Sequence, residues 1–322
     1  MKEYSKYRLI PDLLTRPATS GMAGPIAVFA DWRAHCADLF QRWNTPVERA
    51  IAGGFESIDT GFAFAFGYQA ALQQMAPGHI DHRPASFCVT EAGGNSPSAI
   101  QTRLTRITPE QALLQGEKTF ITNADKAELL LVAASTGEAT TGPDGKFRNP
   151  LAMVVVPAQS PGVSITPLPA PPFAPSIHHG VARFEQVPVT ASQWLPGDGY
   201  SDYVKPFRTV EDIHVSAALL GFLLRIARAH RWPTASIEAL LALIALHQWL
   251  AALPPKDSST HLILAGARQQ MEDWLQANRP HWDLCPPEMA QAWQRDSALL
   301  KVAGKARAQR TQTAWNALQG AS

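Results

Sequence analysis

The sequence predicts a multidomain protein of α and β structure, with an N-terminal helical domain, a central antiparallel β-barrel or sandwich and a C-terminal helical bundle. Two observations support this fold class. Apolar residues recur at three and four positions near both ends of the chain, whereas short β-prone runs separated by Gly, Pro, Asn and Asp fill its middle. We place the three domains at residues 1–84, 85–202 and 203–322.

The N-terminal domain is predicted from helical periodicity between residues 24 and 75. One apolar stripe runs through Trp32, Cys36 and Leu39, and part of another through Phe62 and Phe66. Glycines interrupt these helices, and we expect them to mark close helix packing because they lack side chains. They are Gly53, Gly54, Gly61 and Gly67.

The central domain is predicted from short β-prone runs whose spacing is typical of a barrel or sandwich. The runs are residues 87–90, 100–107, 113–115, 118–121, 129–134, 151–156, 163–166 and 181–184. The proline-rich stretch 167–175 is expected to be a surface crossing, because proline cannot donate a hydrogen bond to a β ladder. Helical periodicity then returns, and we predict helices at 210–230, 236–253, 260–277 and 287–318.

Length and charge limit the classes of function. The chain of 322 residues is long enough for two or three packed domains that can bury a cofactor. Its formal charge of +1 offers no strong field for nucleic acid or an anionic membrane. We find neither a membrane-spanning apolar run nor a secretory leader, and we expect a cytoplasmic protein.

The cysteines and histidines do not indicate a metal site. Cys36, Cys88 and Cys285 are odd in number and far apart, so we expect three reduced thiols. His178 and His179 are adjacent, but no metal-binding spacing such as HExxH is present.

Two motifs of the central domain resemble those of the acyl-CoA dehydrogenase family. The first, Phe87-Cys-Val-Thr-Glu-Ala-Gly-Gly-Asn-Ser96, is similar to the family's strand that ends in Thr-Glu-Pro before a glycine-rich turn and a serine. The second, Gly116-Glu-Lys-Thr-Phe-Ile-Thr-Asn123, resembles its Gly-x-Lys-x-aromatic-Ile-Thr-Asn strand. The turn departs from the family at Ala92, Asn95 and Pro97. The likeness spans the β-domain and implies a shortened, divergent member that binds FAD.

The resemblance implies which residues hold the flavin. Phe120 would supply an aromatic face, and Thr90 and Thr122 would direct hydroxyls to the flavin edge and N5. Main-chain amides near Val89 and Thr90 would reach the pyrimidine end, and Ser96 would contact phosphate or the thioester oxygen. The predicted cofactor-binding residues are Phe87, Val89, Thr90, Ser96, Phe120 and Thr122. Taken alone, each threonine is explained by the β-propensity of its branched side chain.

The resemblance also implies a carboxylate that removes the pro-R hydrogen at the substrate's Cα. Most of the family carries it in a C-terminal Tyr-Glu-Gly motif, where this chain has Ala303 or Gly304. A minority carries it on the first helix after the β-domain, in a Glu-Arg pair followed at a fixed distance by glycine. Glu211 and Gly221 reproduce that spacing.

We therefore predict Glu211 as the catalytic base and Asp212, in the place of the family's arginine, as a substrate-binding residue. A second carboxylate at this position would raise the pKa of Glu211. The alternative is structural, because acidic residues are common in the first turn of a helix, where they favour its dipole.

The family's C-terminal segments that reach a neighbouring subunit's FAD have no counterpart in this sequence. Arginines on the predicted helix 210–230 or within two residues of its ends are candidate replacements for the lost phosphate contacts. They are Arg208, Arg225, Arg228 and Arg231.

The resemblance implies an FAD-dependent dehydrogenase that acts on the CH–CH group of an acyl-CoA or related thioester in fatty acid metabolism. An electron-transfer flavoprotein or similar acceptor and a homodimeric or homotetrameric assembly are implied as partners. A second hypothesis is a degenerate member that acts as a non-catalytic binding or partner subunit. A third is a flavin-dependent monooxygenase of the same fold.

Overall fold

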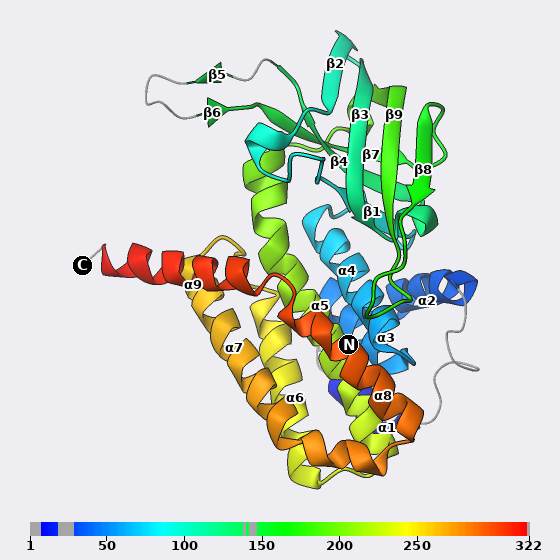
Figure 1. The fold of residues 1–322 in the computed structure, drawn as a ribbon, viewed down its shortest axis with the longest axis vertical. Coiled ribbons are helices and arrows are strands. Elements are labelled where there is room, and N and C mark those ends of the chain that lie inside the picture. The colour runs from blue at the N-terminus through cyan, green and yellow to red at the C-terminus, as the bar shows by residue number, and fades with distance from the viewer. Residues whose placement is uncertain (1–7, 19–28, 138–139, 142–146, 321–322) are drawn as a thin grey trace, which may run out of the picture. The chain divides into compact units, whose positions relative to one another are not determined.

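The computed structural model describes residues 8–18, 29–137, 140–141 and 147–320. The chain divides into two compact units, each described here by itself. The helical unit comprises residues 1–71, 172–176 and 209–322, and the β unit comprises 72–171 and 177–208. The order of elements, helices then strands then helices, confirms the predicted fold class (Figure 1). The separation of the helices into two domains stays a prediction.

The β unit is built on a seven-stranded sheet in the order β1-β4-β2-β3-β9-β8, with β7 paired to β4. Its strands are β1 (Ala85–Cys88), β2 (Arg103–Thr108), β3 (Gln111–Thr122), β4 (Leu129–Ser135), β7 (Leu151–Pro157), β8 (Val163–Pro167) and β9 (His179–Thr190). Strands β5 (Thr140–Thr141) and β6 (Phe147–Arg148) form a separate two-stranded sheet.

The sheet is mixed, which corrects the expectation of a purely antiparallel one. Strand β1 pairs with β4 in parallel, and one residue of β2, Arg103, pairs in parallel with Ser135. The remaining pairs are antiparallel. Parallel partners require long connections, and here β2 and β3 lie between β1 and β4 in the chain. Strand β4 reads as a continuous apolar run because every one of its side chains is buried.

Strand β3 unites two runs that we predicted as separate strands, 113–115 and 118–121. Its register against β9 shifts between Leu114 and Gly116 and again between Lys118 and Ile121. Such bulges interrupt the alternation of buried and exposed side chains from which strands are predicted. Gly116 has a φ of +146°, and a Cβ there would lie 2.5 Å from the Thr102 hydroxyl oxygen, so only glycine fits.

The helical unit contains helices from both ends of the chain. The N-terminal ones are α1 (Leu9–Thr15), α2 (Phe29–Arg42), α3 (Pro46–Glu56) and α4 (Thr60–Met75). The C-terminal ones are α5 (Lys205–Ala229), α6 (Thr234–Leu250), α7 (Ser258–Ala277), α8 (Pro287–Asp296) and α9 (Gly304–Gln319). Their apolar faces form one core that includes Trp32, Phe55, Phe66, Leu223 and Trp282.

Two features of the helical unit differ from the prediction. Helix α1 was not expected, and the single helix predicted at 287–318 is broken into α8, a 3-10 turn at Ser297–Lys301 and α9. The break lies at Ala303, whose φ of +62° is left-handed. The left-handed residue is an alanine and not the adjacent Gly304, and alanine favours a continuous helix.

The expected close helix packing at glycine is confirmed. A Cβ on Gly54 of α3 would lie 1.8 Å from the carbonyl oxygen of Ala218 in α5. A Cβ on Gly67 of α4 would lie 2.6 Å from the Cα of Val215, also in α5. Helix α5 therefore touches both α3 and α4 through their backbones, which brings distant parts of the sequence into one unit.

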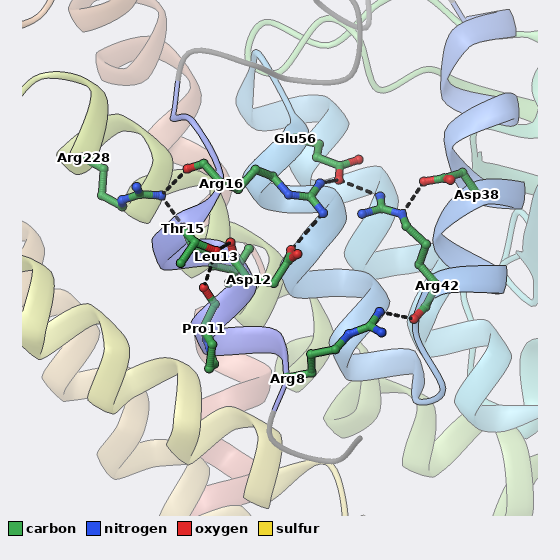
Figure 2. A network of polar contacts seen from close by, with 10 residues as sticks. All are labelled: Arg8, Pro11, Asp12, Leu13, Thr15, Arg16, Asp38, Arg42, Glu56 and Arg228. Carbon is green, nitrogen blue, oxygen red and sulfur yellow. Dashed lines mark hydrogen bonds and ion pairs between the residues drawn. The ribbon is translucent and has the colours of Figure 1, made fainter. Parts of the chain in front are cut away.

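A polar network fastens α1 to its neighbours in this unit (Figure 2). The buried Glu56 carboxylate accepts from Arg16 at 2.5 Å and from Arg42 at 2.7 Å. Arg228 of α5 donates to the carbonyl oxygens of Leu13, Leu14 and Arg16, which end α1. Its guanidinium therefore caps a helix C-terminus, an arrangement that also suits the helix dipole.

The proline-rich stretch is only partly the surface crossing we predicted. Residues 172–176 belong to the helical unit, and Ala174 is buried. The Ala174 amide donates to Asp296 Oδ1 at 2.7 Å, and the Ser176 hydroxyl donates to Asp59 Oδ1 at 3.0 Å. Prolines leave few backbone N–H groups to satisfy, which lets this non-strand segment lie against helices.

Three other expectations concern thiols, metals and membranes. Cys36, Cys88 and Cys285 are all free and buried, and burial raises the pKa of Cys88 to about 12. Among the residues that the structure describes, no group of three His, Cys, Asp or Glu side chains could hold a metal ion. Over the same residues, no helix is both long and apolar enough to span a bilayer.

Candidate functional site

Phe120 is presented to solvent by a backbone irregularity in β3. It lies at the second register shift of the strand, has a φ of +52°, and its residue surface is 67% exposed. A large aromatic residue in this conformation is uncommon and carries a conformational cost. The bulge keeps Lys118 and Ile121 both buried and leaves the ring of Phe120 outside the core. An exposed aromatic face is what a flat ligand requires.

Hydrogen bonds connect Thr90 and Thr122 to the same two stretches of chain, β3 and the segment that contains β1. The Thr119 amide donates to the carbonyl oxygen of Thr90 at 2.8 Å. The Ser86 hydroxyl donates to the carbonyl oxygen of Thr122 at 2.6 Å. Both threonines are partly buried. Three of the six predicted cofactor residues, Thr90, Phe120 and Thr122, therefore lie on two hydrogen-bonded stretches of the β unit.

A buried ion pair fixes these stretches. The Lys118 ammonium donates to Glu91 Oε1 at 2.7 Å and to the Val89 carbonyl oxygen at 3.2 Å. The Glu91 carboxylate also accepts from the amides of Gln101 at 2.7 Å and Thr102 at 3.0 Å. Lys118 thereby ties the segment that precedes the glycine-rich turn to β3, and Glu91 closes the turn at its far end.

The charges of this pair are stabilised by each other. Burial by itself would raise the pKa of Glu91, but Lys118 and the amides of Thr102 and Gln101 outweigh it and hold the pKa below its usual value. Burial lowers the pKa of Lys118, and Glu91 offsets only part of that effect. Both residues lie inside the two motifs but are not among the residues predicted for the site. The signal was available, because a lysine on the buried face of a strand requires a partner.

The glycine-rich turn keeps a compact form despite its departures from the family pattern. The amides and carbonyls of Glu91 and Gly94 exchange two hydrogen bonds of 2.9 Å. Gly94 carries the positive φ of the turn, +113°, so Asn95 does not need to adopt one. Ser96 is exposed, and its hydroxyl lies 2.8 Å from that of Ser98. Whether Ser96 contacts phosphate stays a prediction.

The remaining predicted cofactor residues lie on or just after β1. The ring of Phe87 packs on Phe207 with a centroid distance of 4.1 Å, and Val89 is buried. The side chain of Phe87 therefore already has an aromatic neighbour in the β unit. Val89 has no polar side-chain atom, so it can donate to a ligand only through its main-chain amide.

The fit of the β unit to a flavin can be judged from the unused groups at this place. The amide of Thr90 donates to no acceptor in the part of the chain that the structure describes. The carbonyl oxygen of Thr90 accepts from Thr119, the residue that precedes the exposed Phe120 in β3. An isoalloxazine ring needs a flat apolar face and donors at its polar edge. The residues present fit that group.

The predicted base and its neighbour lie in the helical unit. Glu211 and Asp212 are consecutive residues of α5, both partly buried, and point about 100° apart around the helix axis. Asp212 Oδ1 accepts from Arg307 Nε at 2.9 Å and Nη2 at 2.6 Å, and its Oδ2 accepts from Arg310 Nη2 at 2.5 Å. Both oxygens of Asp212 are therefore engaged with α9. Its negative charge is compensated, which weakens the expected influence on Glu211.

The position of the family's usual base carries no side chain that can act as a base. Ala303 precedes α9 with a left-handed φ, and a Cβ on Gly304 would meet nothing within 4 Å. Gly304 lines a cavity of about 310 Å³ together with Asp212, Arg307 and Arg310. No side chain at 303 or 304 can accept a proton, and Glu211 stays the predicted base.

The predicted arginine replacements differ in their surroundings. Arg228 is committed to the carbonyls of α1, so it is not free to bind phosphate. Arg225 is largely buried, and burial lowers its pKa. Its Nε and Nη2 have no hydrogen-bond partner among the described residues.

Comparison with known proteins shows which family the central segment is similar to. Residues 86–187 match the family model described as acyl-CoA dehydrogenase, middle domain. The acyl-CoA dehydrogenase FadE12 of Mycobacterium tuberculosis is 34% identical over 104 residues, which cover 32% of this chain and 26% of that protein. The Mycobacterium bovis protein of the same name matches to the same extent. The match thus spans about a quarter of these relatives' length.

Solved structures share the fold over nearly the whole chain. A structure described as an FAD-dependent dehydrogenase has a TM-score of 0.69 at 14% identity, covering 99% of this chain and 98% of that chain. Butyryl-CoA dehydrogenase from Megasphaera elsdenii has a TM-score of 0.63 at 14% identity, covering 97% and 95%. At such identities the likeness establishes the fold alone.

Proposed function

We propose that this chain, which belongs to the acyl-CoA dehydrogenase family through its middle domain, is an FAD-dependent oxidoreductase that acts on the CH–CH group of an acyl thioester. The observation that carries the proposal is the group formed by Thr90, Phe120 and Thr122 in the β unit. An exposed aromatic ring on a left-handed backbone, next to an unused amide, has no evident role in the stability of the sheet.

The residues of the β unit would hold the cofactor. The ring of Phe120 would provide a flat apolar face for the flavin, and the Thr90 amide and the hydroxyls of Thr90 and Thr122 would provide hydrogen-bond donors for its polar edge. Lys118 and Glu91 hold these donors in place through their buried ion pair. When bound, the flavin accepts the hydride that leaves Cβ of the acyl group.

Glu211 would provide the general base. Its carboxylate takes the proton from Cα, a hydrogen made acidic by the thioester carbonyl. Its position on α5 rather than before α9 would place this chain in the family's minority arrangement of the base. Asp212 serves as an anchor for α9 through Arg307 and Arg310, and a direct contact with substrate stays a prediction.

The wider context is also proposed. Acyl-CoA is the substrate favoured by the names of the similar proteins. An electron-transfer flavoprotein as acceptor, a homodimer or homotetramer, and a cytoplasmic location stay predictions. A monooxygenase and a non-catalytic subunit are the alternative outcomes of the experiment below.

The test is the anaerobic reduction of the flavin-loaded protein by acyl-CoA thioesters of graded chain length, followed by loss of visible flavin absorbance. We expect reduction of the wild type and a fall of roughly 10²-fold or more in its rate for Glu211→Gln, because general bases typically contribute that much. Glu238→Gln, which removes an exposed carboxylate on α6, is the control and should reduce at the wild-type rate.

Two results would contradict the proposal in different ways. Equal rates for Glu211→Gln and the wild type would remove Glu211 from the mechanism. Loaded protein that no thioester reduces would favour the non-catalytic alternative, and oxygen consumption with externally reduced flavin would favour the monooxygenase.

A further inference from the structure

The cavity of about 310 Å³ in the helical unit is lined by several charged side chains. It is bounded by residues of α5, α7 and α9. Three guanidinium groups, those of Arg268, Arg307 and Arg310, line it together with the carboxylates of Asp212 and Glu272. One positive charge is thus left in excess among these side chains.

The two carboxylates do not neutralise the three arginines equally. Asp212 is shared by Arg307 and Arg310, and both of its oxygens are occupied. Glu272 pairs with Arg268 at 3.0 Å, but the side chain of Glu272 is 49% exposed. An exposed pair is screened by water and contributes little. Arg268 is therefore the least compensated of the three.

Two of the arginines that line the cavity keep unused donors. Arg268 donates through Nη2 to the Leu300 carbonyl oxygen at 2.6 Å and pairs through the same atom with Glu272. Arg310 donates through Nη2 to Asp212. The Nε and Nη1 atoms of both arginines have no partner in the described part of the chain. A guanidinium offers five N–H donors in a planar fork that matches an oxyanion.

The electrostatics of Arg268 agree with this geometry. Its pKa is lowered, first by burial and then by the nearby charge of Arg307, and the carboxylates of Glu272 and Asp212 only partly oppose these effects. The charged form of Arg268 is therefore less stable here than in water, and a bound anion would stabilise it.

We propose that this cavity binds a small organic oxyanion, a carboxylate or a phosphate ester, through Arg268 and Arg310. Their side chains are 24% and 18% exposed, so they are accessible yet partly desolvated, which strengthens charge-assisted hydrogen bonds. Ser216 and Thr311 add hydroxyl groups to the lining. The site lies wholly in the helical unit, does not use the predicted flavin residues, and stands whether or not the chain binds FAD.

The test is a titration of the full-length protein with inorganic phosphate and, separately, with glutarate, at constant ionic strength set by sodium chloride. Binding would be followed by isothermal calorimetry and by the rise of the melting temperature with anion concentration. We expect saturable binding of at least one anion, and the stronger of the two identifies phosphate or carboxylate as the recognised group.

Three variants make the test specific. Arg268→Gln and Arg310→Gln each remove one guanidinium group. Each should weaken anion binding about tenfold or more, the usual effect of losing a charge-assisted hydrogen bond. Arg307 remains in both variants to hold Asp212. Lys305→Gln removes the same charge from the exposed surface of α9, outside the cavity lining, and should bind like the wild type.

The proposal is overturned if neither anion binds more strongly than chloride. It is also overturned if Lys305→Gln loses as much affinity as the two arginine variants, because the effect would then come from net charge. Calorimetry below the melting temperature of each variant keeps the comparison valid if a substitution lowers stability.

Discussion

At the residue scale, the most constrained groups are polar side chains inside the two cores. Glu91 and Lys118 could have been assigned from the sequence, because a lysine on the inward face of a strand needs a buried acceptor. The pairing of Asp212 with Arg307 could not. These residues are separated by 95 positions, and only the packing of α9 brings them together. A sequence pattern can therefore show that a buried charged side chain needs a partner, but it does not identify that partner.

His214 of α5 gives a prediction about pH. It is buried, its Nδ1 lies 2.8 Å from the Val210 carbonyl oxygen, and its pKa is lowered to about 4, mainly by burial and with a smaller contribution from His247. The folded state therefore resists protonation that the unfolded state accepts near the usual value of 6.5. Stability is complete above that pH and is lost as the pH falls from about 6.5 to about 4.

This loss should be on the order of 3 kcal/mol in the free energy of unfolding, from the size of the shift. Urea unfolding between pH 7 and pH 4 measures it. His214→Asn keeps a side-chain donor for Val210 but does not titrate, and it should show a clearly shallower decline. An unchanged slope in this variant would assign the acid sensitivity to other groups, among them His247, whose pKa is also lowered by burial.

At the scale of elements, the sequence predicted the types of the long segments well and their ends less well. The predicted helices 210–230, 236–253 and 260–277 correspond to α5, α6 and α7. The division of 287–318 was missed because the left-handed conformation is adopted by Ala303 and not by the adjacent Gly304. The bulges of β3 were missed for a related reason, since a register shift depends on the partner strand β9. The local secondary-structure propensity of a segment cannot predict a conformation that is imposed by another element.

Two glycines of the helical unit test the packing of α5. Gly54→Ala places a methyl group against the backbone of Ala218 and should lower the free energy of unfolding by about 1–3 kcal/mol or more, the usual cost of overpacking. Gly266→Ala on α7 is the matched control, because its Cβ would meet nothing within 4 Å. It should raise stability by roughly 0.5–1 kcal/mol through helix propensity. Urea unfolding measures the free energy of unfolding of both variants. Equal changes in the two variants would contradict the tight α3–α5 contact.

At the scale of the whole molecule, the sequence predicted the helical, β, helical order and the family to which the middle domain belongs. It did not predict that residues 172–176 leave the β unit to join the helical one. Within the β unit, the two motifs lie on hydrogen-bonded segments, and the role of Thr90, Phe120 and Thr122 in binding a flavin stays a prediction. The helical unit carries Glu211 and an arginine-lined cavity that the sequence did not reveal. Motifs identified the candidate flavin residues because they are local, whereas the cavity depends on three helices.

The most direct test of the flavin proposal is a titration of the purified full-length protein with FAD, followed by quenching of flavin fluorescence. The wild type should bind FAD saturably, and Phe120→Ala should bind it at least about tenfold more weakly, because stacking on an aromatic ring contributes roughly 1–3 kcal/mol in comparable base-binding sites. Ile107→Ala, which removes another exposed apolar side chain of the same sheet, should bind FAD like the wild type. A wild-type protein that binds no FAD, or a Phe120→Ala variant that binds it equally well, would contradict the proposed site.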